Sequence, residues 1–226
     1  MPSHPDPTQP PPRPRLRRSV RAAAAGAAAI VVVAIVAARQ APGWYATRVA
    51  GVPATAERDA RRLVTEVAGL RAAATRPGAW GAAVREEEIN AWLATDLPRN
   101  HVAALPAGLS EPRVRLEPGR IRVAARTAVG PLAGVASIAV EVRLRPAGRL
   151  ECAVVEARIG AIPVPAGPVV HRLAALLDRL GFATETRRLD GRSVIVVSLG
   201  GRGAVLRGLT VDAGELVVAG TTEEVR

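Results

Sequence analysis

VRLEPGRIRVAA, at residues 114–125, is the stretch that decides the fold of this chain. Apolar and charged residues alternate on both sides of a Pro-Gly pair, a pattern that predicts two antiparallel strands joined by a tight turn. The same unit recurs as VEVRLRPAGRLECAVV at 140–155, RRLDGRSVIVVS at 187–198 and LTVDAGELVVAG at 209–220. Four hairpins predict about eight antiparallel strands.

Helical periodicity precedes and interrupts these hairpins. Apolar residues at three- and four-residue steps predict a helix from Thr55 to Ala74 and another from about Arg85 to Thr95, ended by Pro98. A proline-rich step leads into a third helix from Val169 to Leu180. We therefore predict an α+β fold, in which an N-terminal transmembrane helix precedes a curved antiparallel sheet of about eight strands with packing helices.

The predicted transmembrane helix is AAAAGAAAIVVVAIVAA, residues 22–38, which contains no charge, proline or hydroxyl. Seventeen helical residues span about 26 Å, close to the ~30 Å thickness of a bilayer core. Arginines crowd the preceding flank, which favours a cytoplasmic N-terminus, and Trp44 and Tyr45 follow where aromatic side chains favour the interface. The span is rich in alanine and small residues follow it, so a cleaved signal peptide is the alternative.

The composition divides the chain into four parts. Residues 1–21 form a disordered, Pro/Arg-rich cytoplasmic tail, 22–39 the transmembrane helix, 40–82 a juxtamembrane linker helix and 83–226 the exported α+β domain. We therefore expect a single-pass protein of the plasma membrane, with its N-terminus cytoplasmic and its C-terminal domain extracytoplasmic.

Residues that could catalyse are present, but not in catalytic patterns. No serine lies in a nucleophile-elbow context, and the glycines at 200–203 lack the Lys-Ser/Thr and helix of a phosphate loop. The three histidines are scattered, and Glu86, Glu87 and Glu88 occupy consecutive helical positions that point apart. We expect no enzyme, no catalytic residue, no cofactor and no metal. Cys152, the single cysteine, alternates with apolar neighbours and is expected in a buried strand.

Two predicted sheet faces could bind a ligand. The charged face is expected to carry Arg113, Arg115, Arg120, Arg122, Arg143 and Arg145. Residues 113–149 hold eight arginines and two glutamates, a net charge of +6, which suits anionic lipid headgroups. A merely solvated face is the alternative. Nucleic acid is not an expected partner, because no aromatic residues interleave with these arginines.

The opposite face is purely aliphatic. Its members on the first two hairpins are Leu116, Ile121, Val123, Ile138, Val140, Val142 and Leu144. Such a concavity either closes on a packed helix or leaves a groove for acyl chains, and the sequence alone leaves both open.

The run EEEINAWL at 86–93 resembles the EEIN-aromatic-Leu helix of membrane-anchored bacterial envelope proteins in the tubular lipid-binding-like superfamily and related domains of unknown function. RIGAIPVP at 158–165, before the Val169 helix, resembles their step into a packing helix. The resemblance covers roughly residues 83–220. It implies a curved sheet wrapped round a helix, and a role in holding or passing lipids without catalytic residues.

Together these features predict a non-enzymatic, membrane-anchored envelope protein that binds lipid or another amphiphile at the membrane. The alternative is a scaffold or assembly protein of a secretion or division machinery that docks protein partners in the envelope. We expect membrane lipids as the first partners of the charged and aliphatic faces.

Overall fold

The computed structural model describes residues 33, 36–128, 133–179, 181–189, 191–198 and 203–223. The tail at 1–21 and most of the expected span at 22–38 lie outside these residues. Within the span, Val33 and residues 36–38 are helical. No helix of the described part is both long and apolar enough to cross a membrane.

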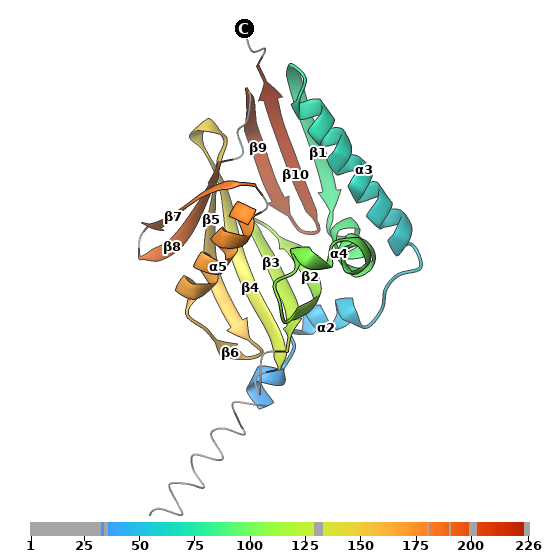
Figure 1. The fold of residues 1–226 in the computed structure, drawn as a ribbon, viewed down its shortest axis with the longest axis vertical. Coiled ribbons are helices and arrows are strands. Elements are labelled where there is room, and N and C mark those ends of the chain that lie inside the picture. The colour runs from blue at the N-terminus through green and yellow to red at the C-terminus, as the bar shows by residue number, and fades with distance from the viewer. Residues whose placement is uncertain are drawn as a thin grey trace, which may run out of the picture.

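The α+β prediction is confirmed, but the strands form two antiparallel sheets where the sequence predicted one (Figure 1). The larger sheet has the order β2-β3-β4-β5-β8-β7, with β6 paired to β5, and the smaller has the order β1-β10-β9. The larger sheet comprises β2 (Leu109–Glu117), β3 (Arg120–Thr127), β4 (Gly134–Arg145), β5 (Arg149–Ile159), β6 (Ile162–Pro163), β7 (Ala183–Leu189) and β8 (Arg192–Ser198). The smaller sheet comprises β1 (Gly78–Arg85), β9 (Ala204–Asp212) and β10 (Glu215–Thr222).

All four predicted hairpins form, as β2–β3, β4–β5, β7–β8 and β9–β10. The expectation of a single sheet is wrong because a strand without a recognisable pattern, β1, pairs along β10 in register from Gly78↔Thr222 to Arg85↔Glu215. The β1 sequence GAWGAAVR contains one β-branched residue, so its composition gave little sign of a strand.

The predicted helices are present with shifted ends. They are α3 (Ala56–Ala74), α4 (Glu86–Asn100) and α5 (Ala166–Arg179), with a short α2 (Gly43–Val49) before them and 3-10 turns η1 (Val102–Ala104) and η3 (Pro146–Gly148). The prediction that Pro98 ends the second helix is wrong. The His101 N–H donates to the Leu97 carbonyl at 2.9 Å, and buried Leu97 holds this last turn against the fold, so the one missing proline N–H is tolerated.

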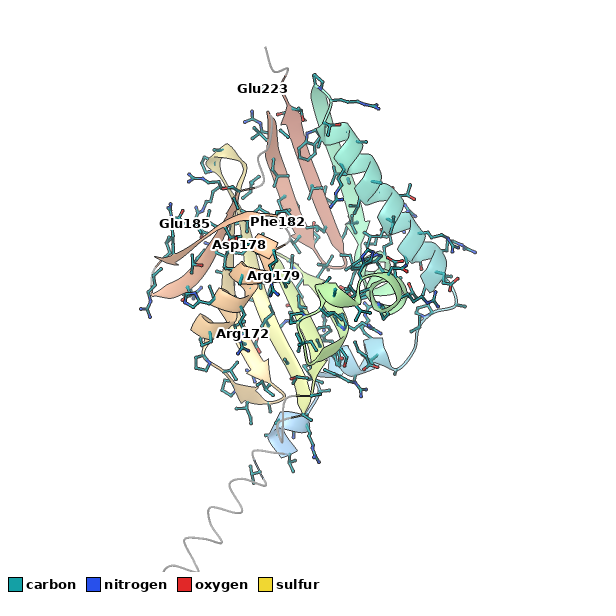
Figure 2. All side chains as sticks on the ribbon, viewed as in Figure 1. Arg172, Asp178, Arg179, Phe182, Glu185 and Glu223 are labelled. Carbon is teal, nitrogen blue, oxygen red and sulfur yellow. The ribbon has the colours of Figure 1, made fainter. Side chains whose placement is uncertain are left out.

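Two clusters of side chains cover the two faces of the larger sheet. On the aliphatic face, α5 inserts Val170 and Ala174 among the buried strand residues Val140, Val154, Ala157, Ile195 and Val197. Charged α5 residues Arg172, Asp178 and Arg179 are exposed (Figure 2). On the charged face, α2 packs Tyr45 against Ala124 and Val135.

The segment at 40–82 is part of this fold, although the sequence separated it as a linker. It supplies α2, α3 and most of β1, so the expected boundary between residues 82 and 83 falls inside a paired strand. Ala56 and Ala60 of α3 are buried against Ala91 of α4. Tyr45 is likewise not an interfacial aromatic, because it is 2% exposed and its hydroxyl donates to the Glu111 carbonyl at 2.9 Å.

Candidate functional site

The six candidate arginines share one face of the larger sheet, as the alternation predicted. The register pairs Arg115 with Arg122 across β2 and β3, Arg120 with Glu141 across β3 and β4, and Arg143 with Glu151 across β4 and β5. Neighbouring strands therefore bring carboxylates in among the guanidinium groups.

The expectation of crowded arginines with few acids is wrong for this face. Glu151 and Glu156 of β5 lie outside the 113–149 window and complete a set of ion pairs. These pairs are Arg115–Glu117 at 3.5 Å, Arg120–Glu141 at 3.1 Å, Arg122–Glu117 at 3.0 Å, Arg122–Glu156 at 3.3 Å, Arg143–Glu141 at 3.6 Å, Arg145–Glu151 at 2.6 Å and Arg158–Glu156 at 2.6 Å. The face is a network of both signs with an excess of arginine.

The ion pairs shift the pKa values of two of their members. The hydrogen bond with Glu117 raises the pKa of Arg122, and the hydrogen bond with Arg145 lowers the pKa of Glu151. Both groups are charged at neutral pH. Partly exposed ion pairs of this kind contribute little to stability.

Arg113 belongs to the same face by register but not to its surface. It is 5% exposed, and its guanidinium donates to the carbonyls of Pro112 at 2.8 Å and Arg48 at 3.3 Å. Burial lowers the pKa of Arg113. The residue therefore ties α2 to β2, and we remove it from the candidate headgroup set.

The seven aliphatic candidates also share one face, on cross-strand positions such as Leu116↔Ile121 and Val123↔Ile138. Leu116 and Val140 are buried. The other five are partly exposed, and we call them the aliphatic band: Ile121, Val123, Ile138, Val142 and Leu144. Two members of the band, Ile138 and Val142, pack against the cluster that α5 forms with the sheet. Helix α5 itself packs on β5, β7 and β8, so it covers only part of the apolar face.

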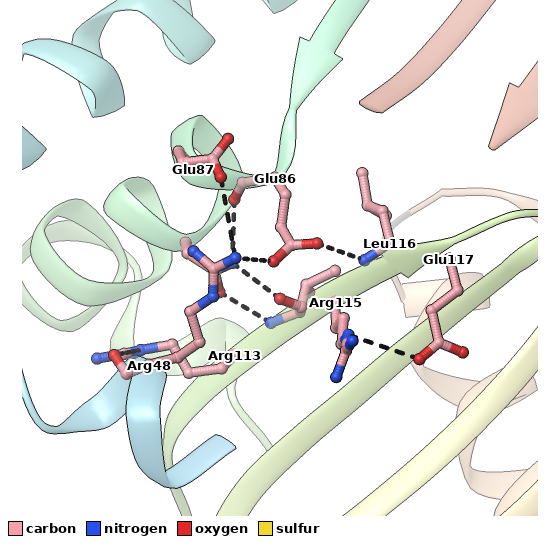
Figure 3. Close-up of polar contacts among 9 residues, drawn as sticks. Arg48, Glu86, Glu87, Arg113, Arg115, Leu116 and Glu117 are labelled. Carbon is pink, nitrogen blue, oxygen red and sulfur yellow. Dashed lines mark hydrogen bonds and ion pairs between the residues drawn. The ribbon is translucent and has the colours of Figure 1, made fainter. Parts of the chain in front are cut away.

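The EEEIN run is a structural junction rather than a ligand site. Glu86 accepts hydrogen bonds from the Arg48 guanidinium and, at 2.7 Å, from the Leu116 N–H (Figure 3). The Asn90 side chain donates to the Val114 carbonyl at 2.8 Å and accepts from the Val114 N–H at 2.9 Å. Both Glu86 and Asn90 are buried, and together they satisfy the open edge of β2.

The other two glutamates point elsewhere, as consecutive helical positions require. Glu88 is buried, accepts from the Arg85 N–H at 3.0 Å at the start of α4, and pairs with Arg62 of α3 at 3.1 Å. The Glu87 side chain is 60% exposed. Within the described residues, no group of three or more His, Cys, Asp or Glu is placed to hold a metal ion.

Two pockets open on the charged face, and the sequence identified neither. The first, of about 260 Å³, lies between the segment after the expected span and the sheet; its walls include Gln40, Trp44, Arg122, Ser137, Glu156 and Arg158. The second, of about 320 Å³, lies beside the β4–β5 and β7–β8 hairpins and includes Arg143, Arg145, Glu151 and Arg192. The sequence missed Arg158 because a register shift in β5, between Val154 and Glu156, brings Arg158 to the charged face, whereas simple alternation from Glu151 would place it on the aliphatic face.

Cys152 lies on the aliphatic face, partly exposed and packed against the α5 cluster. Burial, with a smaller effect from Glu151, raises its thiol pKa to about 11. The thiol is therefore neutral at physiological pH and has none of the electropositive surroundings that activate a cysteine.

No model of a known protein family matches this chain, and neither the curated proteins nor the solved structures give a match. The proposed function therefore rests on the geometry of the two faces of the larger sheet.

Proposed function

We propose that this chain is a single-pass, membrane-anchored envelope protein that binds lipid or another amphiphile beside the membrane without catalysing a reaction. Its N-terminus would be cytoplasmic and its α+β domain extracytoplasmic. The resemblance of residues 83–220 to tubular lipid-binding-like envelope proteins implies the same role, since it implies a sheet wrapped round a helix that holds or passes lipids.

The observation that carries the proposal is the aliphatic band. Its five side chains are partly exposed on β3 and β4, beside helix α5, in a domain that follows the expected span directly. Partly exposed aliphatic side chains at neighbouring strand positions are the kind of surface on which an apolar ligand binds. A tether to the bilayer gives that surface lipid at high local concentration.

A photo-crosslinking experiment tests the band in the membrane. A diazirine amino acid replaces Val123 in the full chain, and adducts are identified by mass spectrometry after irradiation of whole membranes. The matched control replaces Val217, which is 36% exposed on β10 of the smaller sheet. We expect lipid adducts at position 123 well above those at 217. Equal yields at both positions would refute a lipid site on the band.

A scaffold is the second candidate, and the packing of α5 favours it. The cluster formed by Val170 and Ala174 with Ile195 closes part of the face that a lipid would otherwise occupy. In that role the charged face would dock protein partners. A second diazirine position separates the two functions: one recurrent protein adduct at exposed Arg143 of the charged face supports the scaffold, and recurrent lipid adducts at position 123 support the carrier.

A further inference from the structure

The pocket beside Trp44 contains a shared ion pair. One Glu156 oxygen accepts from the Arg122 guanidinium at 3.3 Å, and the other pairs with Nε of Arg158 at 2.6 Å. Two arginines thus share one carboxylate, and Arg122 also pairs with Glu117 at 3.0 Å, which Arg115 approaches at 3.5 Å. Among the described residues, the terminal nitrogens of Arg158 have no hydrogen-bond partner, so its guanidinium has donors left for a ligand.

The other wall of this pocket is fixed in place by glycines at the ends of β4 and β5. The Ala161 N–H donates to the Ala37 carbonyl at 2.8 Å, and Ala38 is fully buried. A Cβ atom added at Gly160 or Gly134 would collide with the backbone of Ala37 or Ala38. The last residues of the expected span therefore rest against the sheet, and the chain enters the pocket wall at Gln40.

Charge and size restrict the ligand. The connected ion pairs of Arg115, Arg122 and Arg158 with Glu117 and Glu156 leave one excess positive charge, which suits a singly charged anion. Arginine donates in a fork that matches phosphate oxygens. A volume of about 260 Å³ suits a headgroup and not an acyl chain. Trp44, partly exposed in the wall, is a residue that favours the membrane interface.

We propose that this pocket binds the phosphate of an anionic phospholipid headgroup at the point where the chain leaves the membrane. The site differs from the aliphatic band, whose side chains lie on the opposite face of the sheet, although Ile138 of β4 belongs to the band and also lines the pocket. It rests on the proposed membrane anchorage, and it gives the charged face a specific ligand. Binding there would hold the domain in one orientation against the bilayer through Arg122 and Arg158.

Native mass spectrometry tests the pocket on the full chain released from nanodiscs of phosphatidylcholine doped with phosphatidylglycerol. We expect one retained phosphatidylglycerol, bound about tenfold more weakly by the variant Arg158→Gln, which corresponds to about 1.4 kcal/mol. Glu156→Gln removes the competing carboxylate and should strengthen retention, a gain that misfolding would not produce. Arg187→Gln, an exposed arginine of β7 paired with Glu185, is the charge-matched control and should bind as the wild type does.

Three results would overturn the proposal. Equal retention by wild type and Arg158→Gln would remove the pocket as a lipid site, as would an equal loss in Arg187→Gln. Tight binding of inorganic phosphate alone, with no preference for the lipid, would assign the pocket to a free anion. Adducts at position 123 report the aliphatic band separately, so failure of the pocket leaves the carrier proposal standing and failure of the band leaves the pocket standing.

Discussion

Replacing Asn90 by aspartate should destabilise the domain at neutral pH far more than its small change in shape suggests. The amide nitrogen of Asn90 donates to the carbonyls of Val114 at 2.8 Å and Glu86 at 3.0 Å, and the residue is 7% exposed. A carboxylate at this position would lose both donations and direct a negative charge at two carbonyl oxygens. It would keep only the hydrogen bond from the Val114 N–H.

The magnitude follows from these contacts. Two lost hydrogen bonds cost about 2 kcal/mol, and burying the unpaired charge adds roughly 1–3 kcal/mol. The total of about 3–5 kcal/mol is a large part of the ~5–15 kcal/mol that stabilises a typical domain. It corresponds to a decrease in Tm of about 6–20 °C.

The loss should also depend on pH. Burial and the two carbonyls raise the pKa of the introduced carboxyl above its unfolded value of about 3.9. The folded state then binds the proton more tightly than the unfolded state, so stability is lowest at neutral pH and recovers as the pH falls through the folded pKa. Asn90→Ala lacks a titrating group and should show no such recovery relative to wild type.

Two assays check this on the full chain in detergent. Thermal unfolding is followed from pH 4 to pH 8, and hydrogen exchange is measured on peptides that cover β2, because Asn90 protects the Val114 amide. The control is Thr65→Asp, at an exposed position of α3 whose hydroxyl donates to the Arg61 carbonyl at 3.0 Å. If Asn90→Asp and Thr65→Asp melt alike and β2 stays protected in both, the reasoning about the edge of β2 is wrong.

Three other outcomes follow from the structure. Gly160→Ala should release the end of the expected span from the sheet and speed tryptic cleavage after Arg39. The reason is that the new Cβ would collide with Ala37 and Ala38, at a residue whose φ is +59°. The control Gly167→Ala in α5 has open space around it and should not change the rate of cleavage. Alkylation of Cys152 at pH 8 should be slow in the folded chain and fast after denaturation, because a pKa of about 11 leaves roughly one thiol in a thousand ionised. Glu86→Gln should destabilise by about 1–3 kcal/mol in thermal unfolding, since the charge that Arg48 faces is lost while the hydrogen bond from Leu116 can persist.

The hairpins were predictable because the residues of each hairpin determine its strands and its turn locally. Alternation sets the faces of a strand and a glycine turn sets its register, and both are local. The assignment of Ile121, Val140 and Arg120 to their faces therefore agrees with the register of the sheet. Helices α3 and α5 were predictable for the same reason, since amphipathic periodicity is read within a single segment.

What the sequence did not reveal depends on distant partners. Strand β1 forms because it pairs with the free edge of β10. Its sequence, GAWGAAVR, has little intrinsic preference for a strand, so the strand could not be predicted locally. The partial neutralisation of the arginine face depends on Glu151 and Glu156, which the pairing of β4 with β5 brings into reach. The burial of Arg113 follows from α2 packing across β2, which no local pattern encodes.

The spacing of the EEEIN motif now has a geometric explanation. Four helical residues from Glu86 to Asn90 rise about 6 Å. Two strand residues from Val114 to Leu116 rise about 6.8 Å. The near match lets Asn90 reach Val114 while Glu86 reaches Leu116, on an edge where the Gly214 N–H satisfies the Leu116 carbonyl at 3.2 Å. The spacing of Glu86 and Asn90 is therefore determined by the distance between the backbone groups of β2 and not by a ligand. The motif closes this edge of the sheet, so the function must be sought on the two faces of the sheet, which the motif does not cover.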